Sequence, residues 1–266
     1  MKIAIIGAGN MGGAIARGLA QSGSVNEGDL RVSNPSPRKL QALQQDFPFI
    51  TVSQDNKEVV RGADLVLLAV KPWKLESVAQ ELIPVLDLDK QMLASVAGGV
   101  GLAELKALFG DSHAHMPYFY VMPNTAVAVC QSMTFLAACG ATEAQTESVA
   151  QLFRLLGKVE VVEERLMDAG MSLASCGIAF AMRYIRAAME GGVELGFYPS
   201  QAQHIVMQTL QGAVSLLENS GLHPEAEIDR VTTPGGITIR GLNEMEHAGF
   251  TDSVIRGLRA AKPLKK

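Results

Sequence analysis

One glycine-rich turn near the start of the chain constrains its fold more than any other feature. The apolar run Lys2–Ile6 leads directly into Gly7-Ala8-Gly9-Asn10-Met11-Gly12, and an amphipathic helical pattern follows. In a strand–turn–helix unit, this spacing gives one glycine for the tight turn, one for backbone approach to a pyrophosphate and one for close helix packing. The turn predicts a dinucleotide site, with expected contacts at Gly7, Gly9, Asn10, Met11 and Gly12.

The alternation that begins at this turn continues as far as Val162, with short apolar or β-branched runs between longer amphipathic segments. The predicted strands are Lys2–Ile6, Asp29–Ser33, Ala63–Val70, Gln91–Val96, Tyr118–Met122 and Lys158–Val162. The predicted helices are Met11–Ser22, Pro37–Gln45, Lys74–Val85, Leu102–Leu108 and Thr142–Leu156. This order predicts an α/β domain over residues 1–162, a Rossmann-type doubly wound parallel sheet.

The second half of the chain, residues 163–266, is predicted to be an all-α domain. Its expected helices are Glu163–Ser175, Gly177–Leu195, Ser200–Asn219 and Ile237–Ala248. Gly177–Leu195 carries few charges on any face, and a small helical domain alone would expose that surface to water. We therefore expect a homodimer formed through the C-terminal helices.

Composition excludes several classes of protein. Apolar residues make up 48% of the 266 residues and charged residues 19%, which is typical of a globular chain. The net charge is −4, and the only dense basic cluster, Lys262–Lys266, is interpreted as a solvated end, so no nucleic-acid partner is expected. The uncharged run Ala169–Met182 is too short to span a bilayer, so no membrane partner is expected.

The cysteines and histidines bear on compartment and metal binding. Three cysteines, an odd number, fit a reducing compartment, and the N-terminal apolar run is shorter than a signal-peptide core. We therefore expect a cytoplasmic protein. His113 and His115 have no carboxylate or cysteine to complete a ligand set, so no metal is expected.

Cofactor choice is normally determined about 20 residues beyond the glycine turn, where an acid would bind a ribose hydroxyl. This chain has Ser33 and Asn34 there, followed by Arg38 and Lys39. Hydroxyl, amide and guanidinium groups suit a 2′-phosphate, so Ser33, Asn34 and Arg38 favour NADPH, with NADH as the alternative. The competing interpretation is that Arg38 and Lys39 simply begin a solvated helix.

Three further loops follow predicted strands, at the sheet edge where open α/β sheets bind ligands. They are Val70-Lys71-Pro72-Trp73, Ala97-Gly98-Gly99 and Met122-Pro123-Asn124-Thr125. Each loop has an ordinary explanation in turn chemistry. Together they outline a crevice, with expected cofactor contacts at Val70, Lys71, Pro72, Ala97, Gly98, Pro123 and Asn124.

Near the C-terminus, Thr232–Leu242 combines a proline and adjacent glycines with a helix start. The free N–H groups of a first helical turn attract anions, so the segment is a candidate carboxylate site. An ordinary capped helix start is the alternative.

These segments resemble the Δ1-pyrroline-5-carboxylate reductase family, and the resemblance covers nearly the whole chain. It rests on Ile5–Gly12, Ala69–Pro72, Val121–Thr125 and Thr232–Leu242, the last being the signature of the family. The resemblance implies an NAD(P)H-dependent oxidoreductase acting on CH–NH groups in proline biosynthesis. It would transfer a hydride from NADPH to the C=N carbon of 1-pyrroline-5-carboxylate, giving L-proline.

The resemblance also implies residue roles and an assembly. Backbone amides of Gly235, Gly236 and Ile237 would bind the substrate carboxylate, and Thr238 would be the catalytic hydrogen-bonding residue. Pro123 and Asn124 would lie near the nicotinamide, with Lys71 and Ala97 along the cofactor. Relatives commonly assemble dimers into larger rings.

The chain departs from the family pattern at several positions that bear on substrate range. Tyr120 stands where relatives usually have arginine, Ala126 where they have proline, and Cys176 and Ile178 fall within a partly kept Gly-Ser-Gly-Pro-Ala pattern. Two other functions stay open: reduction of a related imine or hydroxy acid, and a non-catalytic dinucleotide-binding regulator. Hydroxy-acid dehydrogenases generally need a lysine that Gly177–Leu195 lacks, and the retained Thr238 argues against a regulator.

Overall fold

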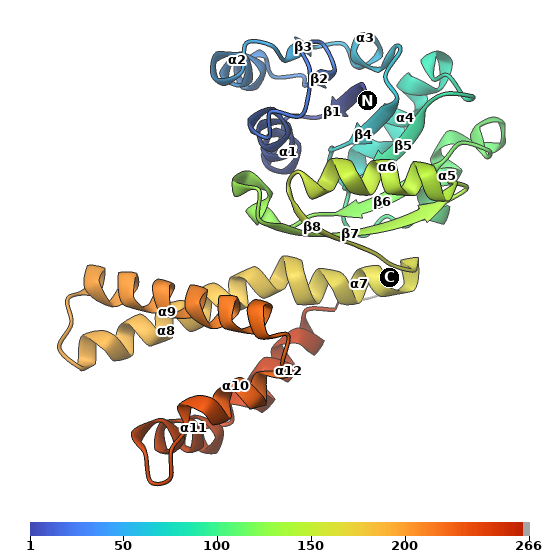
Figure 1. Ribbon diagram of the computed structural model, residues 1–266. Helices are drawn as coiled ribbons and strands as arrows, with labels where there is room; N and C mark the ends of the chain where they lie inside the picture. The colour runs from blue at the N-terminus through green and yellow to red at the C-terminus, as the bar shows by residue number, and fades with distance from the viewer. Residues whose placement is uncertain (263–266) are drawn as a thin grey trace. The chain divides into compact units, whose positions relative to one another are not determined.

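The structure, a computed structural model, describes residues 1–262 and divides into two compact units, residues 1–175 and 176–262. The expected solvated basic end at 262–266 lies outside the described residues, apart from Lys262. Figure 1 shows the sheet of the first unit and the helices of the second.

Within the described residues, the first unit contains one eight-stranded sheet with the order β3-β2-β1-β4-β5-β6-β7-β8. The strands are β1 Ile3–Ile6, β2 Leu30–Ser33, β3 Thr51–Ser53, β4 Leu65–Leu68, β5 Met92–Ser95, β6 Tyr118–Met122, β7 Ser132–Cys139 and β8 Gly157–Val161. The first six are parallel, which confirms the Rossmann-type fold class. β7 runs antiparallel to β6, and β8 runs parallel to β7, so the sheet is parallel only in its larger part.

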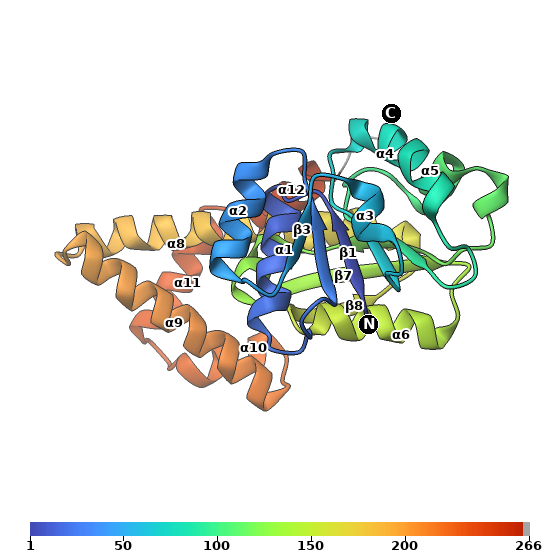
Figure 2. The same cartoon turned by 90° about the horizontal axis from the view of Figure 1, so that it is seen from above.

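Helices cover both faces of this sheet (Figure 2). They are α1 Asn10–Gln21, α2 Pro37–Asp46, α3 Asn56–Val60, α4 Leu75–Leu82, α5 Leu102–Phe109, α6 Glu143–Arg154 and α7 Met167–Gly170. Ile3 and Ile5 of β1 pack with α1, α2 and α6, whereas Ala4 and Ile6 pack with α3, α4 and α5. Because successive side chains of a strand point to opposite faces, both faces are apolar and the central strands are continuous buried runs.

The segment after β8 belongs to the first unit as far as Ser175. It comprises a 3₁₀ turn at Glu164–Leu166, α7 and a π-helix at Met171–Cys176, whose last residue begins the second unit. α7 contacts β7, and Met167 is buried in the same core as β4 and β5. The predicted domain boundary near Val162 followed the change to helical pattern, whereas the division by packing follows Ser175.

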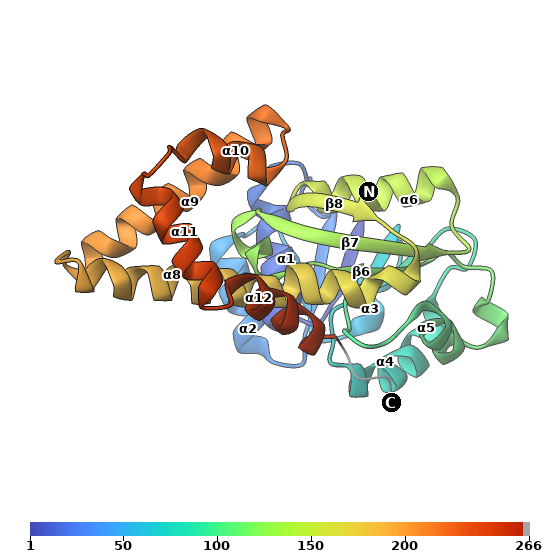
Figure 3. The ribbon, with the colours of Figure 1, turned by 90° about the horizontal axis from the view of Figure 1, so that it is seen from below.

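The second unit is entirely helical. It contains α8 Gly177–Glu194, α9 Pro199–Ser220, α10 Pro224–Val231, α11 Ile237–His247 and α12 Phe250–Ala260. Gly196 (φ +102°) follows α8 and Pro199 begins α9. The two helices contact each other and run from this turn at an angle, as a V in Figure 3. Of the described residues 176–262, Ala202 alone is buried. This unit has almost no core of its own.

Candidate active site

The turn between β1 and α1 leaves open space at one of its three glycines. Gly7 has φ +106°, and a Cβ there would lie 2.7 Å from the carbonyl oxygen of Ala69. A Cβ at Gly12 would collide with the carbonyl oxygen of Gly7, whereas a Cβ at Gly9 would meet nothing within 4 Å. No side chain caps the start of α1. The turn therefore offers free N–H groups beside open space, which suits a phosphate.

A cleft of about 920 Å³ extends from this turn along the carboxyl edge of the sheet. It brings together these predicted residues: Gly7, Gly9, Asn10, Met11, Asn34, Val70, Lys71, Pro72, Ala97 and Gly98. Its charged lining residues are three lysines, Lys39, Lys71 and Lys74, and one carboxylate, Glu81. The net positive lining favours an anionic ligand.

Other predicted residues do not line this cleft. They are Gly12, Ser33, Arg38, Pro123 and Asn124. Ser33 is fully buried, and its Oγ donates to Oδ1 of Asn56 at 2.7 Å. Arg38 is exposed on the first turn of α2, and its neighbour Lys39 reaches the cleft instead.

Asn34 links the glycine turn to the end of β2. Its Oδ1 accepts the N–H of Ala8 at 3.0 Å, and its Nδ2 donates to the carbonyl of Ser36 at 3.3 Å. The N–H of Gly7 also donates to the carbonyl of Ser33 at 2.8 Å. The end of β2 therefore fixes the shape of the turn as well as lining the cleft.

Asn56 and Glu81 are among the polar residues of the cleft that were not predicted, together with Lys74 and Ser77. Nδ2 of Asn56 donates to Oε2 of Glu81 at 2.8 Å, which connects α3 to α4. Asn56 was missed because β3 and α3 are too short for periodicity to show. The β-branched pair Thr51-Val52 and the helix-capping residue Asp55 are the sequence features that could have indicated β3 and the start of α3.

Asn124 lies behind the cleft at the end of β6. It is 6% exposed, and its Oδ1 accepts the N–H of Ala126 at 3.0 Å. Its Nδ2 donates to the carbonyl of Ala174 at 3.4 Å, and its own N–H donates to Oγ of Ser132 at 3.1 Å. The adjacent Thr125 does line the cleft. Asn124 therefore fixes the loop that carries Thr125.

The predicted carboxylate segment lies at the start of α11 in the second unit. Gly235 has φ +71°, and a Cβ at Gly236 would lie 2.5 Å from Oγ1 of Thr233, so both positions favour glycine. α11 begins at Ile237 with no side-chain cap and no acidic residue in its first turn. Ile237 and Thr238 are exposed. The first-turn N–H groups are therefore available to an anion.

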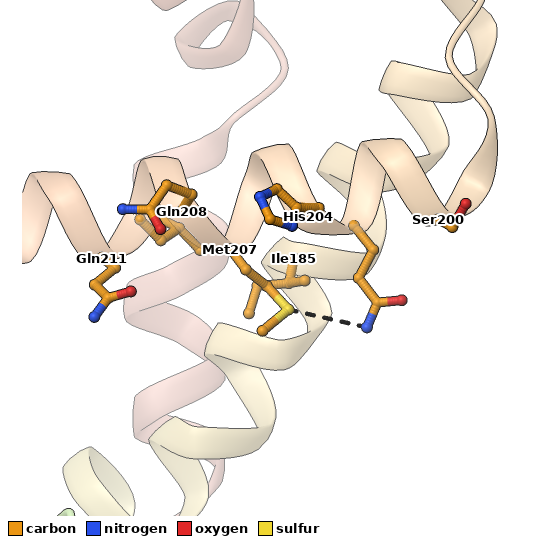
Figure 4. Close-up of a pocket in the computed structure, with 8 residues that line it drawn as sticks. Ile185, Ser200, His204, Met207, Gln208 and Gln211 are labelled. Atoms are coloured by element: carbon orange, nitrogen blue, oxygen red, sulfur yellow. Dashed lines mark hydrogen bonds between the residues drawn. The ribbon is translucent and has the colours of Figure 1, made fainter.

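A second hollow of about 590 Å³ lies between α8 and α9 (Figure 4). Ile185 of α8 faces it, together with Ser200, Gln203, His204, Met207, Gln208, Leu210 and Gln211 of α9. Nε2 of Gln203 donates to Sδ of Met207 at 3.9 Å. These lining residues, all within the described chain, include no carboxylate, lysine or arginine. The hollow has no constellation for catalysis.

Within residues 1–262, no three His, Cys, Asp or Glu side chains are grouped so that they could hold a metal ion. No helix of the same residues is long and apolar enough to cross a membrane.

Comparison with known proteins gives a consistent match. The protein-family model described as pyrroline-5-carboxylate reductase dimerisation matches residues 164–265. The family model described as NADP oxidoreductase coenzyme F420-dependent matches residues 2–99. The pyrroline-5-carboxylate reductase of Pisum sativum is 35% identical over 97% of this chain and 93% of its own. The chain belongs to the pyrroline-5-carboxylate reductase family.

Two further relatives agree with this membership of the pyrroline-5-carboxylate reductase family. Pyrroline-5-carboxylate reductase 1 of Dictyostelium discoideum is 34% identical over 96% of this chain, which spans only 48% of that longer protein. The crystal structure of Plasmodium falciparum pyrroline carboxylate reductase with NADP bound has a TM-score of 0.85 at 26% identity. The match covers 98% of this chain and 95% of that one.

The positions expected to depart from the family pattern can be located in the structure. A proline at position 126 would have no N–H and could not make the bond from Ala126 to Oδ1 of Asn124. Cys176 ends the π-helix Met171–Cys176, and Ile178 follows in α8. π-helical turns are rare and often occur at functional sites.

Proposed function

We propose that the protein is a pyrroline-5-carboxylate reductase, which reduces the cyclic imine 1-pyrroline-5-carboxylate to L-proline with NADPH. The observation that carries the proposal is the match to a named reductase over nearly the full length of both chains. The dinucleotide turn and the Thr232–Leu242 signature lie within that match and supply the two chemistries that the reaction needs.

Cofactor binding is assigned to the cleft of the first unit. We propose that N–H groups of Gly9, Asn10 and Met11 receive the pyrophosphate, with Lys71 nearby. Asn34 and Lys39 lie on the side of the turn where the adenosine 2′-phosphate would sit, which supports NADPH over NADH. When bound, NADPH supplies the hydride. The NADP in the Plasmodium falciparum structure supports this assignment.

Substrate binding is assigned to the start of α11. The N–H groups of Gly235, Gly236 and Ile237, at the uncapped start of α11, would bind the ring carboxylate. The N–H of Gly236 also donates to the carbonyl of Thr233 at 2.9 Å, so the carboxylate would share this donor. Thr238 would donate its hydroxyl to the carboxylate or hydrogen-bond at the ring nitrogen. Hydride addition to the C=N carbon of the protonated imine gives the neutral ring amine, so a hydroxyl that orients the protonated imine would assist the reaction.

We also infer a cytoplasmic homodimer. The described part of the second unit buries only Ala202 and exposes large apolar side chains such as Met207, Val214 and Leu216, which a second copy would cover. Further association of dimers into a ring is part of this proposal and would appear as multiples of the dimer mass in light scattering. The three cysteines are unpaired, which fits a reducing compartment.

The proposal is tested by mixing purified protein, NADPH and pyrroline-5-carboxylate and following the absorbance of the reduced cofactor. Turnover to proline supports it. A thermal shift with NADPH but no turnover would favour a non-catalytic regulator, and oxidation of hydroxy acids with NADP⁺ would favour the related dehydrogenases.

The role of Thr238 is tested in the same assay. Thr238→Ala is expected to lower kcat/KM by roughly 10- to 150-fold, the range for losing a charge-assisted hydrogen bond of about 1.5–3 kcal/mol. Thr238→Ser keeps the hydroxyl and serves as the matched control. An alanine variant with the kcat/KM of the unaltered protein would remove Thr238 from the site.

A further inference from the structure

Strand β6 carries two buried tyrosines on the same face of the sheet, and their hydroxyls form hydrogen bonds with different segments of the chain. Tyr118 is 0% exposed, and its hydroxyl donates to the carbonyl of His113 at 3.0 Å. Tyr120 is 3% exposed, and its hydroxyl oxygen instead accepts the N–H of Gly99 at 3.2 Å. Gly99 belongs to the loop between β5 and α5, so Tyr120 contacts the loop that lines the cofactor cleft.

This loop depends on few bonds for its shape. The N–H of Ala97 donates to Oγ of Ser95 at 3.2 Å, and the N–H of Leu102 donates to Oε1 of Glu164 at 2.5 Å. Between these points, the N–H of Val100 donates to the carbonyl of Ala97 at 3.4 Å, and Gly99, with φ +83°, donates its N–H to Tyr120. The N–H of Gly98, which lines the cleft, donates to no other described residue. A bound cofactor therefore has a free donor there, provided that the loop keeps its shape.

The order of strands in the sheet indicates which half of a bound dinucleotide the Ala97–Gly99 loop would contact. β1, which leads into the pyrophosphate turn, lies between β2 and β4, and β5 follows β4. Asn34 after β2 lies on the adenosine side of that turn, so the loop after β5 lies on the nicotinamide side.

We propose that Tyr120 is a positioning residue for the nicotinamide half of NADPH, which it serves by holding the Ala97–Gly99 backbone in its binding shape. This inference rests on the cofactor of the proposed function and is independent of the imine substrate. Phenol chemistry fits the role, because a phenol oxygen can accept the N–H of Gly99, whereas a side chain with donors only could not.

The surroundings of Tyr120 keep its phenol in the neutral form. Burial raises the pKa of Tyr120, the hydrogen bond from Gly99 lowers it, and the carboxylates of Asp168 and Glu164 raise it further. Tyr120 belongs to the buried core that also contains Ala97, Val100 and Leu102. A phenylalanine would keep this packing and remove only the acceptor.

The test compares Tyr120→Phe with Tyr118→Phe by isothermal titration calorimetry of the full-length protein. Two ligands are titrated: NADPH, and 2′-phospho-ADP, which lacks the nicotinamide half. Tyr120→Phe is expected to raise the Kd for NADPH about 5- to 10-fold, because the N–H of Gly99 loses its acceptor and the loop loses its fixed shape. The Kd for 2′-phospho-ADP is expected to stay unchanged. Tyr118→Phe is expected to change neither Kd.

Three outcomes would overturn the proposal: an unchanged Kd for NADPH in Tyr120→Phe, equal weakening of both ligands, or an equal effect from Tyr118→Phe. Hydrogen exchange of the unaltered protein gives a second test, which does not depend on whether a substituted protein folds. The amide of Gly99 is expected to exchange slowly without ligand, and fast exchange there would contradict the bond. Both readouts measure binding or protection, so absence of imine turnover would refute only the proposed reaction.

Discussion

Gly7, Gly9 and Gly12 share a motif but have different surroundings. Gly12 is enclosed by the carbonyl of Gly7 and the methyl of Ala69, whereas the space around Gly9 is empty. Requirements for folding and for ligand binding are therefore separated among neighbouring residues of one turn.

A matched pair of alanine substitutions follows from this separation. Gly12→Ala is expected to destabilise the fold by about 3 kcal/mol through overpacking. Gly9→Ala is expected to change the free energy of unfolding by less than about 1 kcal/mol. It should nevertheless weaken NADPH at least tenfold, because its methyl would occupy the path of the pyrophosphate. Urea unfolding and calorimetric titration check the pair, and unimpaired NADPH binding by Gly9→Ala would contradict the phosphate site.

The lysine beside Arg38 gives a second test at this scale. Lys39 lines the cleft and Arg38 does not. If a cation on α2 binds the 2′-phosphate, Lys39→Ala should weaken NADPH about tenfold and leave NADH nearly unchanged. Arg38→Ala is the matched control. A larger loss of NADPH affinity in Arg38→Ala would restore the assignment made from the sequence.

At the scale of elements, strands with apolar buried residues could be predicted, whereas β3 and β7 could not. β7 buries Ser132 and Thr134, whose hydroxyls lie 3.1 Å apart, while Met133 and Phe135 are only partly buried. Its alternation is therefore the reverse of the usual apolar pattern, and the sequence reasoning passed over it. The antiparallel step at β6–β7 was missed for the same reason.

Short elements and the C-terminal helices show a different limit. β3 and α3 contain three and five residues, too few for a period to appear. α12 was not predicted, because a glycine such as Gly249 typically follows the end of a helix. In the structure Gly249, with φ +82°, directly precedes α12. Predicted cleft residues came mainly from loops after the apolar strands β1, β4 and β5. Of the residues missed, Asn56 lies in the short helix α3, whereas Glu81 lies in α4, a helix that was predicted without a role for this side chain.

Tyr118 of strand β6 should make the free energy of unfolding depend on pH in the alkaline range. Burial, and secondarily Cys139, raises the pKa of Tyr118 from 10.0 to about 12. A raised folded-state pKa means that the unfolded chain releases this proton first. The stabilisation is therefore complete below pH 10 and is lost as the pH rises towards 12, by at most about 3 kcal/mol.

Tyr118→Phe should flatten this alkaline decline. Urea unfolding of both proteins at intervals from about pH 9 to about pH 11.5 would measure it. The variant keeps Tyr120, whose pKa is also raised, so the difference between the two proteins isolates Tyr118. Parallel declines in the two proteins would show that Tyr118 ionises equally in the folded and unfolded chains.

At the scale of the whole molecule, stability should depend on protein concentration. Of the described second unit only Ala202 is buried, so its helices need the surface of another copy. The apparent Tm is expected to rise by about 1–2 °C for each tenfold increase in concentration, because a dimer gains stability by mass action. Differential scanning calorimetry across a dilution series, with mass from sedimentation, checks this. A Tm unaffected by dilution would contradict it.

The nearly coreless second unit also has a consequence for the supply of the protein in a cell. A newly made chain can fold its sheet alone, but it would keep its helices exposed to proteases until it meets a second chain. Encounters between chains increase with the square of their concentration. Where synthesis is slow, we expect the amount of mature protein to rise more steeply than the rate of translation.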